Sequence, residues 1–349
     1  MKKTVTIVLT LLMLLSIAAC SKPGKEASAP TAEPTALNKT AKTGTAAPTA
    51  EPAKEPVPTL PAGELPENYG VAVLDGERVL FVSAGDGPRE IGYGMEDGGE
   101  LTGPTAFAVS GGKVFIFDYV NYRILIYDRY GSVEKSVDLR ACVHNFCVYE
   151  NRIYIAFDEP MNDAIYAYDL STGETERLPF AEGANEGNDL VGITFRTLED
   201  GLEIALGDKC FRLNAQKNEF LYKYEINKVN RGPQDTYKFP DGREVTVDIG
   251  ANTRSWLLWY SDEYLVLECV KHVNGHSVYE RSVRKYNMKG ELVGCSVEAS
   301  ELAYVTCGYW IGVTPEGEIY TILLDEAGAH VTKPNLRPAY RSYYDGAEG

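Results

Sequence analysis

The chain has 349 residues, enough for one large domain or about two of ordinary size. Its 34 Lys and Arg stand against 50 Asp and Glu, a formal charge of −16, and the acidic excess lies after residue 64, where 27 basic residues face 45 acidic ones. Such a body lacks the cations that replace counterions on a phosphate backbone, and it gains nothing from anionic lipid headgroups. We therefore expect no nucleic-acid partner and no membrane attachment by charge.

Residues 1–19 have the form of a secretory signal. A Met-Lys-Lys start precedes the uncharged apolar run 4–19, which at 16 residues is too short to span a bilayer. The run ends Ile17-Ala-Ala-Cys20 and resembles the lipobox of bacterial lipoproteins. The resemblance implies cleavage before Cys20 and its acylation, so that chains such as palmitate anchor the protein on the extracytoplasmic face of the cell membrane. The alternative is an ordinary signal peptide cut near Ala19.

Residues 20–64 are predicted to be a lipidated Cys followed by a disordered tether. The segment 21–64 holds eight of the 18 Pro and no aromatic residue, and Ala-Pro-Thr-Ala-Glu-Pro occurs in it twice. Such a segment cannot bury enough apolar surface to offset its ordering entropy. Proline favours an extended chain of about 3.1 Å per residue, so the tether supplies reach.

Residues 65–349 are predicted to form one all-β domain. Short apolar or alternating runs are separated there by Gly, Asn and Asp, and two stretches, 107–131 and 146–173, align at an offset of 39 to 41 residues. Each reads as four strands, with a turn from Asp to Gly before the last one. Four-stranded units that repeat every 40–50 residues are typical of β-propeller blades.

Weaker copies of the unit bring the predicted number of blades to six, each of four antiparallel strands. Extra length at 228–248 indicates an insertion or long loop with a hairpin in it, and residues 340–344 are expected to close the ring by pairing near 70–74. The weaker copies are Arg78–Val82, Gly201–Leu213, Tyr264–Tyr279 and Glu318–Leu323.

The clearest unit, residues 103–131, resembles an NHL repeat. It has Gly-Pro before an apolar strand that ends in Asp118, then Asn121-x-Arg123-Ile, then an Asp-x-x-Gly turn. The resemblance is partial in the next unit and faint after residue 180. It implies a six-bladed β-propeller of the type found in extracytoplasmic bacterial proteins. We interpret Asp118, Asn121 and Arg123 as a structural turn and ion pair, because no second catalytic group can be placed beside them.

Four aromatic residues are candidates for binding. Trp256 and Trp259 lie three positions apart, and Tyr309-Trp310 follows one blade later. Aromatic side chains offer platforms for sugars and proteins. The alternative is that they fill the core between blades.

No catalytic or metal-binding motif is recognisable, so we assign no catalytic residue, no metal ligand and no cofactor. His272 and His276 flank an Asn-Gly turn and could approach a metal with Glu268 or Glu280, although a polar hairpin tip explains them as well. Five acids at related places in the units could hold Ca²⁺ if they face the central channel, or could cap turns: Asp86, Asp118, Asp158, Asp208 and Asp325.

Six cysteines follow Cys20, and their pairing stays open between disulfides and buried thiols. They are Cys142, Cys147, Cys210, Cys269, Cys295 and Cys307.

The sequence favours a membrane-anchored extracytoplasmic propeller that binds a protein or a cell-wall glycan, and not an enzyme. Two alternatives remain. One is a hydrolase or lyase that uses a metal in the central channel, and the other is an extracytoplasmic sensor.

Overall fold

The computed structural model describes residues 76–95, 101–139, 141–158, 164–180, 192–272, 279–299 and 308–340. The predicted signal, lipobox and tether therefore lie outside the described residues. Within them the chain is all-β, with strands and no helix, and so no helix there could cross a bilayer. The all-β prediction is confirmed.

Five sheets have four antiparallel strands, and the chain fills four of them in simple order from the innermost strand outward. Each strand reaches its neighbour through a tight turn, as the Gly-rich sequence predicts. The first three of these sheets are β4 (Ala106–Ser110), β5 (Lys113–Asp118), β6 (Arg123–Tyr127) and β7 (Val133–Asp138); β8 (Val143–Tyr149), β9 (Arg152–Phe157), β10 (Ile165–Asp169) and β11 (Thr175–Leu178); and β12 (Thr194–Leu198), β13 (Gly201–Leu206), β14 (Lys209–Asn214) and β15 (Glu219–Glu225).

Two further four-stranded sheets come from the last third of the chain, and the second also takes the first described strand. A small ribbon of two strands follows that first strand. They are β19 (Thr253–Tyr260), β20 (Tyr264–His272), β21 (Tyr279–Asn287) and β22 (Leu292–Ala299); β23 (Ile311–Val313), β24 (Ile319–Asp325), β25 (Gly328–Pro334) and β1 (Gly76–Ser83); and the ribbon β2 (Gly94–Met95) with β3 (Leu101–Thr102).

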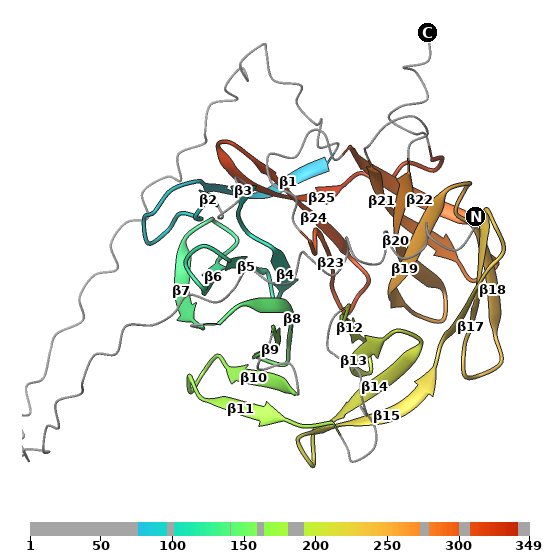
Figure 1. Cartoon of the computed structure of the whole chain (residues 1–349), viewed down its shortest axis with the longest axis horizontal. Helices are drawn as coiled ribbons and strands as arrows, with labels where there is room; N and C mark the ends of the chain where they lie inside the picture. The colour runs from blue at the N-terminus through green and yellow to red at the C-terminus, as the bar shows by residue number, and fades with distance from the viewer. Residues whose placement is uncertain are drawn as a thin grey trace, which may run out of the picture. The chain divides into compact units, whose positions relative to one another are not determined.

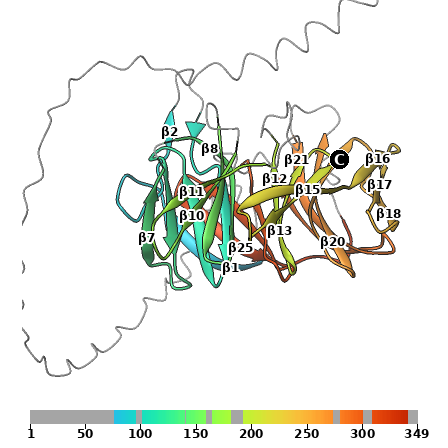
Figure 2. The ribbon, with the colours of Figure 1, turned by 90° about the horizontal axis from the view of Figure 1, so that it is seen from below.

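The sheets stand around a common axis as the blades of a propeller (Figure 1). The innermost strands meet there, since β4 neighbours both β23 and β8, β8 neighbours β12, and β12 neighbours β19. Turned by 90°, the sheets stand side by side and their strands run between the two faces of the ring (Figure 2). The predicted propeller of six successive blades is confirmed, with one blade that departs from four strands.

The fourth sheet has three strands, β16 (Asn227–Asn230), β17 (Gln234–Lys238) and β18 (Glu244–Asp248), and lies at the periphery of the ring (Figure 1). It provides no innermost strand, because β12 contacts β19 directly. The extra length predicted at 228–248 is this sheet, and the expected hairpin is β17–β18, whose turn closes from the Gly242 amide to the Phe239 carbonyl at 3.0 Å.

A buried ionic cluster joins the third and fifth four-strand positions of the ring where that inner strand is missing. Arg196 on β12 donates to Glu203 on β13 at 2.7 Å and to the Leu257 carbonyl on β19 at 3.1 Å. Tyr260 on β19 also donates to Glu203, at 3.1 Å. Removing one partner of such a buried pair leaves an uncompensated charge, at a cost of about 3–5 kcal/mol.

The ring closes through β1, which pairs antiparallel with β25 from Gly76 opposite Pro334 to Ser83 opposite Gly328. The segment Arg78–Val82, predicted to belong to a blade of its own, is therefore the outer strand of the last blade. The closing strand is also not 340–344. Tyr340 instead donates to Glu280 and lies over Arg284, with the guanidinium carbon 4.0 Å from the ring centroid.

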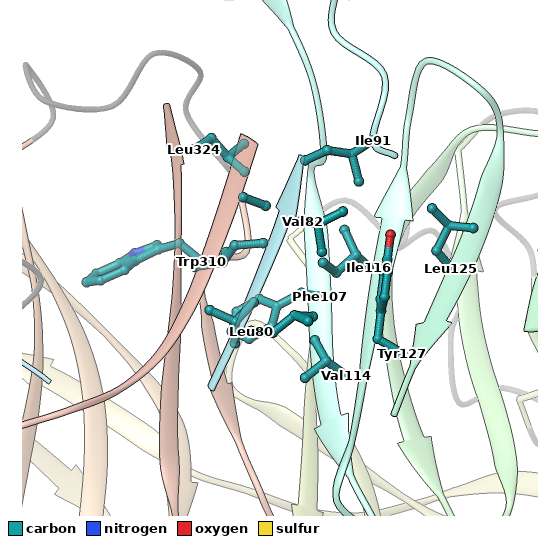
Figure 3. Close-up of a cluster of buried hydrophobic side chains, with 13 residues drawn as sticks. Leu80, Val82, Ile91, Phe107, Val114, Ile116, Leu125, Tyr127, Trp310 and Leu324 are labelled. Atoms are coloured by element: carbon teal, nitrogen blue, oxygen red, sulfur yellow. The ribbon is translucent and has the colours of Figure 1, made fainter. Parts of the chain in front are cut away.

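Apolar side chains fill the space between neighbouring blades. Figure 3 shows the cluster between the last blade and the first, in which Leu80 and Val82 from β1 meet Ile116 and Leu125. Each is at most 4% exposed. A fully buried side chain of this size contributes about 1.5–3 kcal/mol, so ring closure draws on one continuous core.

The predicted turn from Asp or Asn to Gly recurs in three blades with the same bonds. Oδ1 of Asp128 accepts the amides of residues 130 and 132 at 2.8 Å, and Asp169 and Asn287 accept amides in the same way. The glycines that end these turns have φ between 78° and 84°. Glycine adopts this conformation at little cost, which explains the motif.

Five of the six cysteines of the body are described, and all five are free thiols. Cys307 lies outside the described residues. Burial raises the pKa of Cys210 to about 11 and that of Cys269 to about 12. These side chains therefore pack as small hydrophobic groups.

Ring closure depends on glycine at position 328. Its φ is +148°, and an added Cβ would lie 1.9 Å from the carbonyl oxygen of Val82 on β1. We expect Gly328→Ala to lower the free energy of unfolding by roughly 3 kcal/mol, as measured by urea titration. The matched control is Gly111→Ala, since Gly111 also has a positive φ but open space around it, and should cost about 1 kcal/mol. Equal losses would contradict this account of closure.

Candidate functional site at the mouth of the central channel

The innermost strands enclose a partly open cavity of about 70 Å³. Four aromatic rings line it, each from a different blade: Phe107, Phe146, Phe195 and Tyr309. Asn145, Thr194, Thr197 and the Tyr309 hydroxyl supply its polar lining, together with the Cys147 thiol. The cavity has room for about two water molecules. Among its described lining residues none carries a carboxylate or an imidazole.

His144 lies where the inner strands begin, at the end of the cavity that we call the channel mouth. Its Nε2 is 2.9 Å from the Tyr309 hydroxyl and accepts the Gly192 amide at 3.0 Å. Its Nδ1 lies 3.3 Å from Oδ1 of Asp158. Because a backbone amide can only donate, Nε2 must accept, which places the ring proton on Nδ1 and makes Tyr309 the donor.

A second group of polar side chains holds the neighbouring residue. Trp310 donates from Nε1 to Oε1 of Glu268 at 2.7 Å, and Arg281 donates to the same oxygen at 2.9 Å. The Arg281 guanidinium carbon lies 4.9 Å from the Trp310 ring centroid, and a further nitrogen bond reaches the Gly308 carbonyl at 3.1 Å. Strands β20 and β21 thereby fix the short segment that brings Tyr309 to the mouth.

The pKa of the Tyr309 phenol is raised well above its usual value. Burial is the largest cause, followed by the negative charges of Glu268 and Asp158. Tyr309 is therefore a neutral hydrogen-bond donor and not an activated nucleophile. The two carboxylates also make the mouth electronegative, although the cavity itself is uncharged.

Trp256 provides an exposed aromatic face beside this group. It lies opposite Glu268 in the pairing of β19 with β20, and two residues before Leu258, which lines the cavity. It is 44% exposed. We define the channel-mouth cluster as His144, Asp158, Trp256, Glu268, Arg281, Tyr309 and Trp310.

The four aromatic candidates from the sequence thus occupy different environments. Trp256 is exposed and Tyr309 lines the cavity, whereas Trp259 and Trp310 are 4% and 3% exposed. Trp259 packs with Val266 and Ile319 between two blades, so its side chain is part of the core.

Asp118, Asn121 and Arg123 form a buried structural connection away from the mouth. Asp118 is fully buried and accepts Arg123 at 2.9 Å, Asn121 at 2.8 Å and the Gly92 amide at 3.1 Å. Arg123 also donates to the Glu90 carbonyl at 2.8 Å. The three side chains therefore tie the segment after β1 to the first blade.

The acids and histidines considered as metal ligands have other partners. Asp325 accepts the amides of residues 327 and 328 and contacts His330 at 2.7 Å. Glu268 and Glu280 bind Trp310 and Tyr340, and His276 lies outside the described residues. In the described ranges no three His, Cys, Asp or Glu side chains gather in a way that could hold a metal ion.

Sequence reasoning did not find His144, Asp158 or Arg281 as members of a site, and it considered Glu268 only as a metal ligand. His144 and Tyr309 are 165 positions apart. No local motif signals such a contact, which arises because both residues precede or begin inner strands.

No family model matches the chain, and no curated protein sequence matches it. Solved structures resemble it at low similarity. A streptogramin B lyase is 14% identical over 67% of this chain and 93% of that one, with a TM-score of 0.38. BamB from Moraxella catarrhalis is 10% identical over 78% and 95%, at 0.35. The calcium-binding protein regucalcin from Agrobacterium tumefaciens is 11% identical over 68% and 94%, at 0.37. Likeness of this degree assigns no function.

The raised pKa of Tyr309 predicts a specific loss of stability in alkali. An unfolded phenol has a pKa of about 10, so the contribution of the folded, protonated phenol is complete below pH 10 and is lost as the pH rises toward the folded value. Between pH 10 and 11.5 the free energy of unfolding of the native protein should fall more steeply than that of Tyr309→Phe, by about 1 kcal/mol per pH unit. Urea titrations at several pH values measure this, with the exposed Tyr130→Phe as control. Parallel curves for native protein and Tyr309→Phe would refute it.

Proposed function

We propose that the chain is a lipid-anchored, extracytoplasmic binding module that takes its protein or cell-wall glycan partner at the channel mouth. The observation that supports this best is the exposed Trp256 beside a partly open cavity with an uncharged lining. Such a cavity, bordered by a few fixed polar groups, suits recognition, because burial supplies affinity and the polar groups supply orientation.

The cellular address is part of this proposal and rests on sequence. The lipobox-like ending at Cys20 supports cleavage and acylation, and the Pro-rich segment 21–64 supports a tether that holds the propeller away from the membrane. The NHL-type pattern at 103–131 is compatible with this setting.

The metal-dependent hydrolase has less support than the binding module. The described cavity lining offers no carboxylate or imidazole for a metal, and the raised pKa of Tyr309 makes it a poor nucleophile. A sensor would use the same mouth to report its ligand to a membrane partner, and therefore makes the same demand on Trp256.

Replacing Trp256 tests the binding role. Because its side chain is exposed, Trp256→Ala should leave the unfolding midpoint within error but reduce partner recovery at least about tenfold in crosslinking and co-purification from the native cell surface. The control is Tyr130→Ala, another exposed aromatic, at 58%, on the turn before β7. Any partner retained equally by both variants would argue against the channel mouth as the binding surface.

Replacing Cys20 tests the anchor. Cys20→Ser removes the sulfur that would carry the diacylglycerol group, so the protein should lose incorporation of labelled palmitate and move from the membrane to the soluble fraction. Cys142→Ser is the matched control, since that thiol lies in the propeller. Unchanged membrane recovery and labelling of Cys20→Ser would overturn the lipoprotein assignment.

A further inference from the structure

The central cavity combines aromatic walls with a negatively charged mouth. Its four rings come from four different blades, Phe107, Phe146, Phe195 and Tyr309, so they surround the axis. A cation near aromatic faces is attracted by their quadrupoles, and the attraction grows as the site excludes water. Rings gathered around an uncharged cavity are the side chains that an organic cation requires.

The charges around the mouth have the sign that this ligand requires. Asp158 and Glu268 both act on the Tyr309 hydroxyl, and Asp158 keeps nearly half of its side chain exposed. His144 is neutral, since its Nε2 accepts an amide proton. The single nearby cation, among the described residues of the cluster, is Arg281, which is bound to Glu268 and stacked on Trp310.

Size and long-range charge narrow the ligand further. A cavity of about 70 Å³ admits an ammonium group with its last methylene, about the space of two waters, but not a sugar ring. The body of 285 residues carries −18, which draws cations toward it and repels anions. Trp256 at the rim can cover the alkyl part of the ligand that stays outside.

We infer that the channel mouth recognises an alkylammonium group, such as a lysine side chain of a protein partner, with its head among the aromatic rings and its stem against Trp256. This inference rests on the proposed function, because it names the ligand chemistry of the same site.

A charge series tests the ligand class. The full-length protein in detergent is titrated with n-butylammonium chloride and with n-butanol, by calorimetry and by tryptophan fluorescence. The ammonium should bind at least about tenfold more tightly than the neutral alcohol, and its affinity should fall with added salt. Equal binding of the two, or no binding of either, would overturn the inference.

Variants locate the binding. Glu268→Gln and Phe195→Leu should each weaken butylammonium at least about fivefold, the first by removing charge and the second by removing a ring while keeping an apolar side chain. Tyr130→Ala should change nothing. If Glu268→Gln unfolds, as judged by circular dichroism, Phe195→Leu decides alone, and undiminished binding by a folded Phe195→Leu refutes the site.

A peptide pair identifies the source of the ammonium group. A Gly-Gly-Lys-Gly-Gly peptide is compared with its Nε-acetylated form, which keeps the stem and loses the charge. Preference for the free lysine supports a protein partner, whereas binding of butylammonium without the peptide supports the class and assigns a small amine. If partner recovery depends on Trp256 while no cation binds, the inference fails and the proposed function stands.

Discussion

The antiparallel pairing of β1 with β25 is the interaction on which the rest of the ring depends. It joins strands that are more than 240 residues apart in sequence and completes the last blade with the first described strand. A propeller blade buries its faces only against its neighbours, so an open ring would expose two apolar sheets to water. Closure therefore fixes the positions of all innermost strands, and with them the cavity.

The narrow cavity follows from the irregular fourth blade. Because its three strands lie at the periphery, β12 and β19 approach each other directly, and the ring of innermost strands is tighter by one member. The cluster of Arg196, Glu203 and Tyr260 replaces apolar packing at that junction. Buried ion pairs contribute little net stability, but they hold one geometry, since any other arrangement leaves a charge unpaired.

The channel mouth separates chemical roles over a short distance. The aromatic lining excludes charge, while Asp158 and Glu268 place it at the rim and hold His144 and Trp310 in fixed orientations. Tyr309 belongs to both regions, with its ring in the cavity and its hydroxyl on His144. This arrangement favours selective binding over bond cleavage, because its polar groups are already engaged with one another and none is activated.

The sequence by itself determined the all-β class, the blade period and the turns from Asp or Asn to Gly, since these depend on residues close together in the chain. It also indicated the extra segment at 228–248 by length alone. Only the tertiary structure decided which strand closes the ring, that Trp256 is exposed while Trp259 is buried, and that His144 meets Tyr309. Those outcomes depend on how blades pack across long sequence separations, for which local patterns carry no signal.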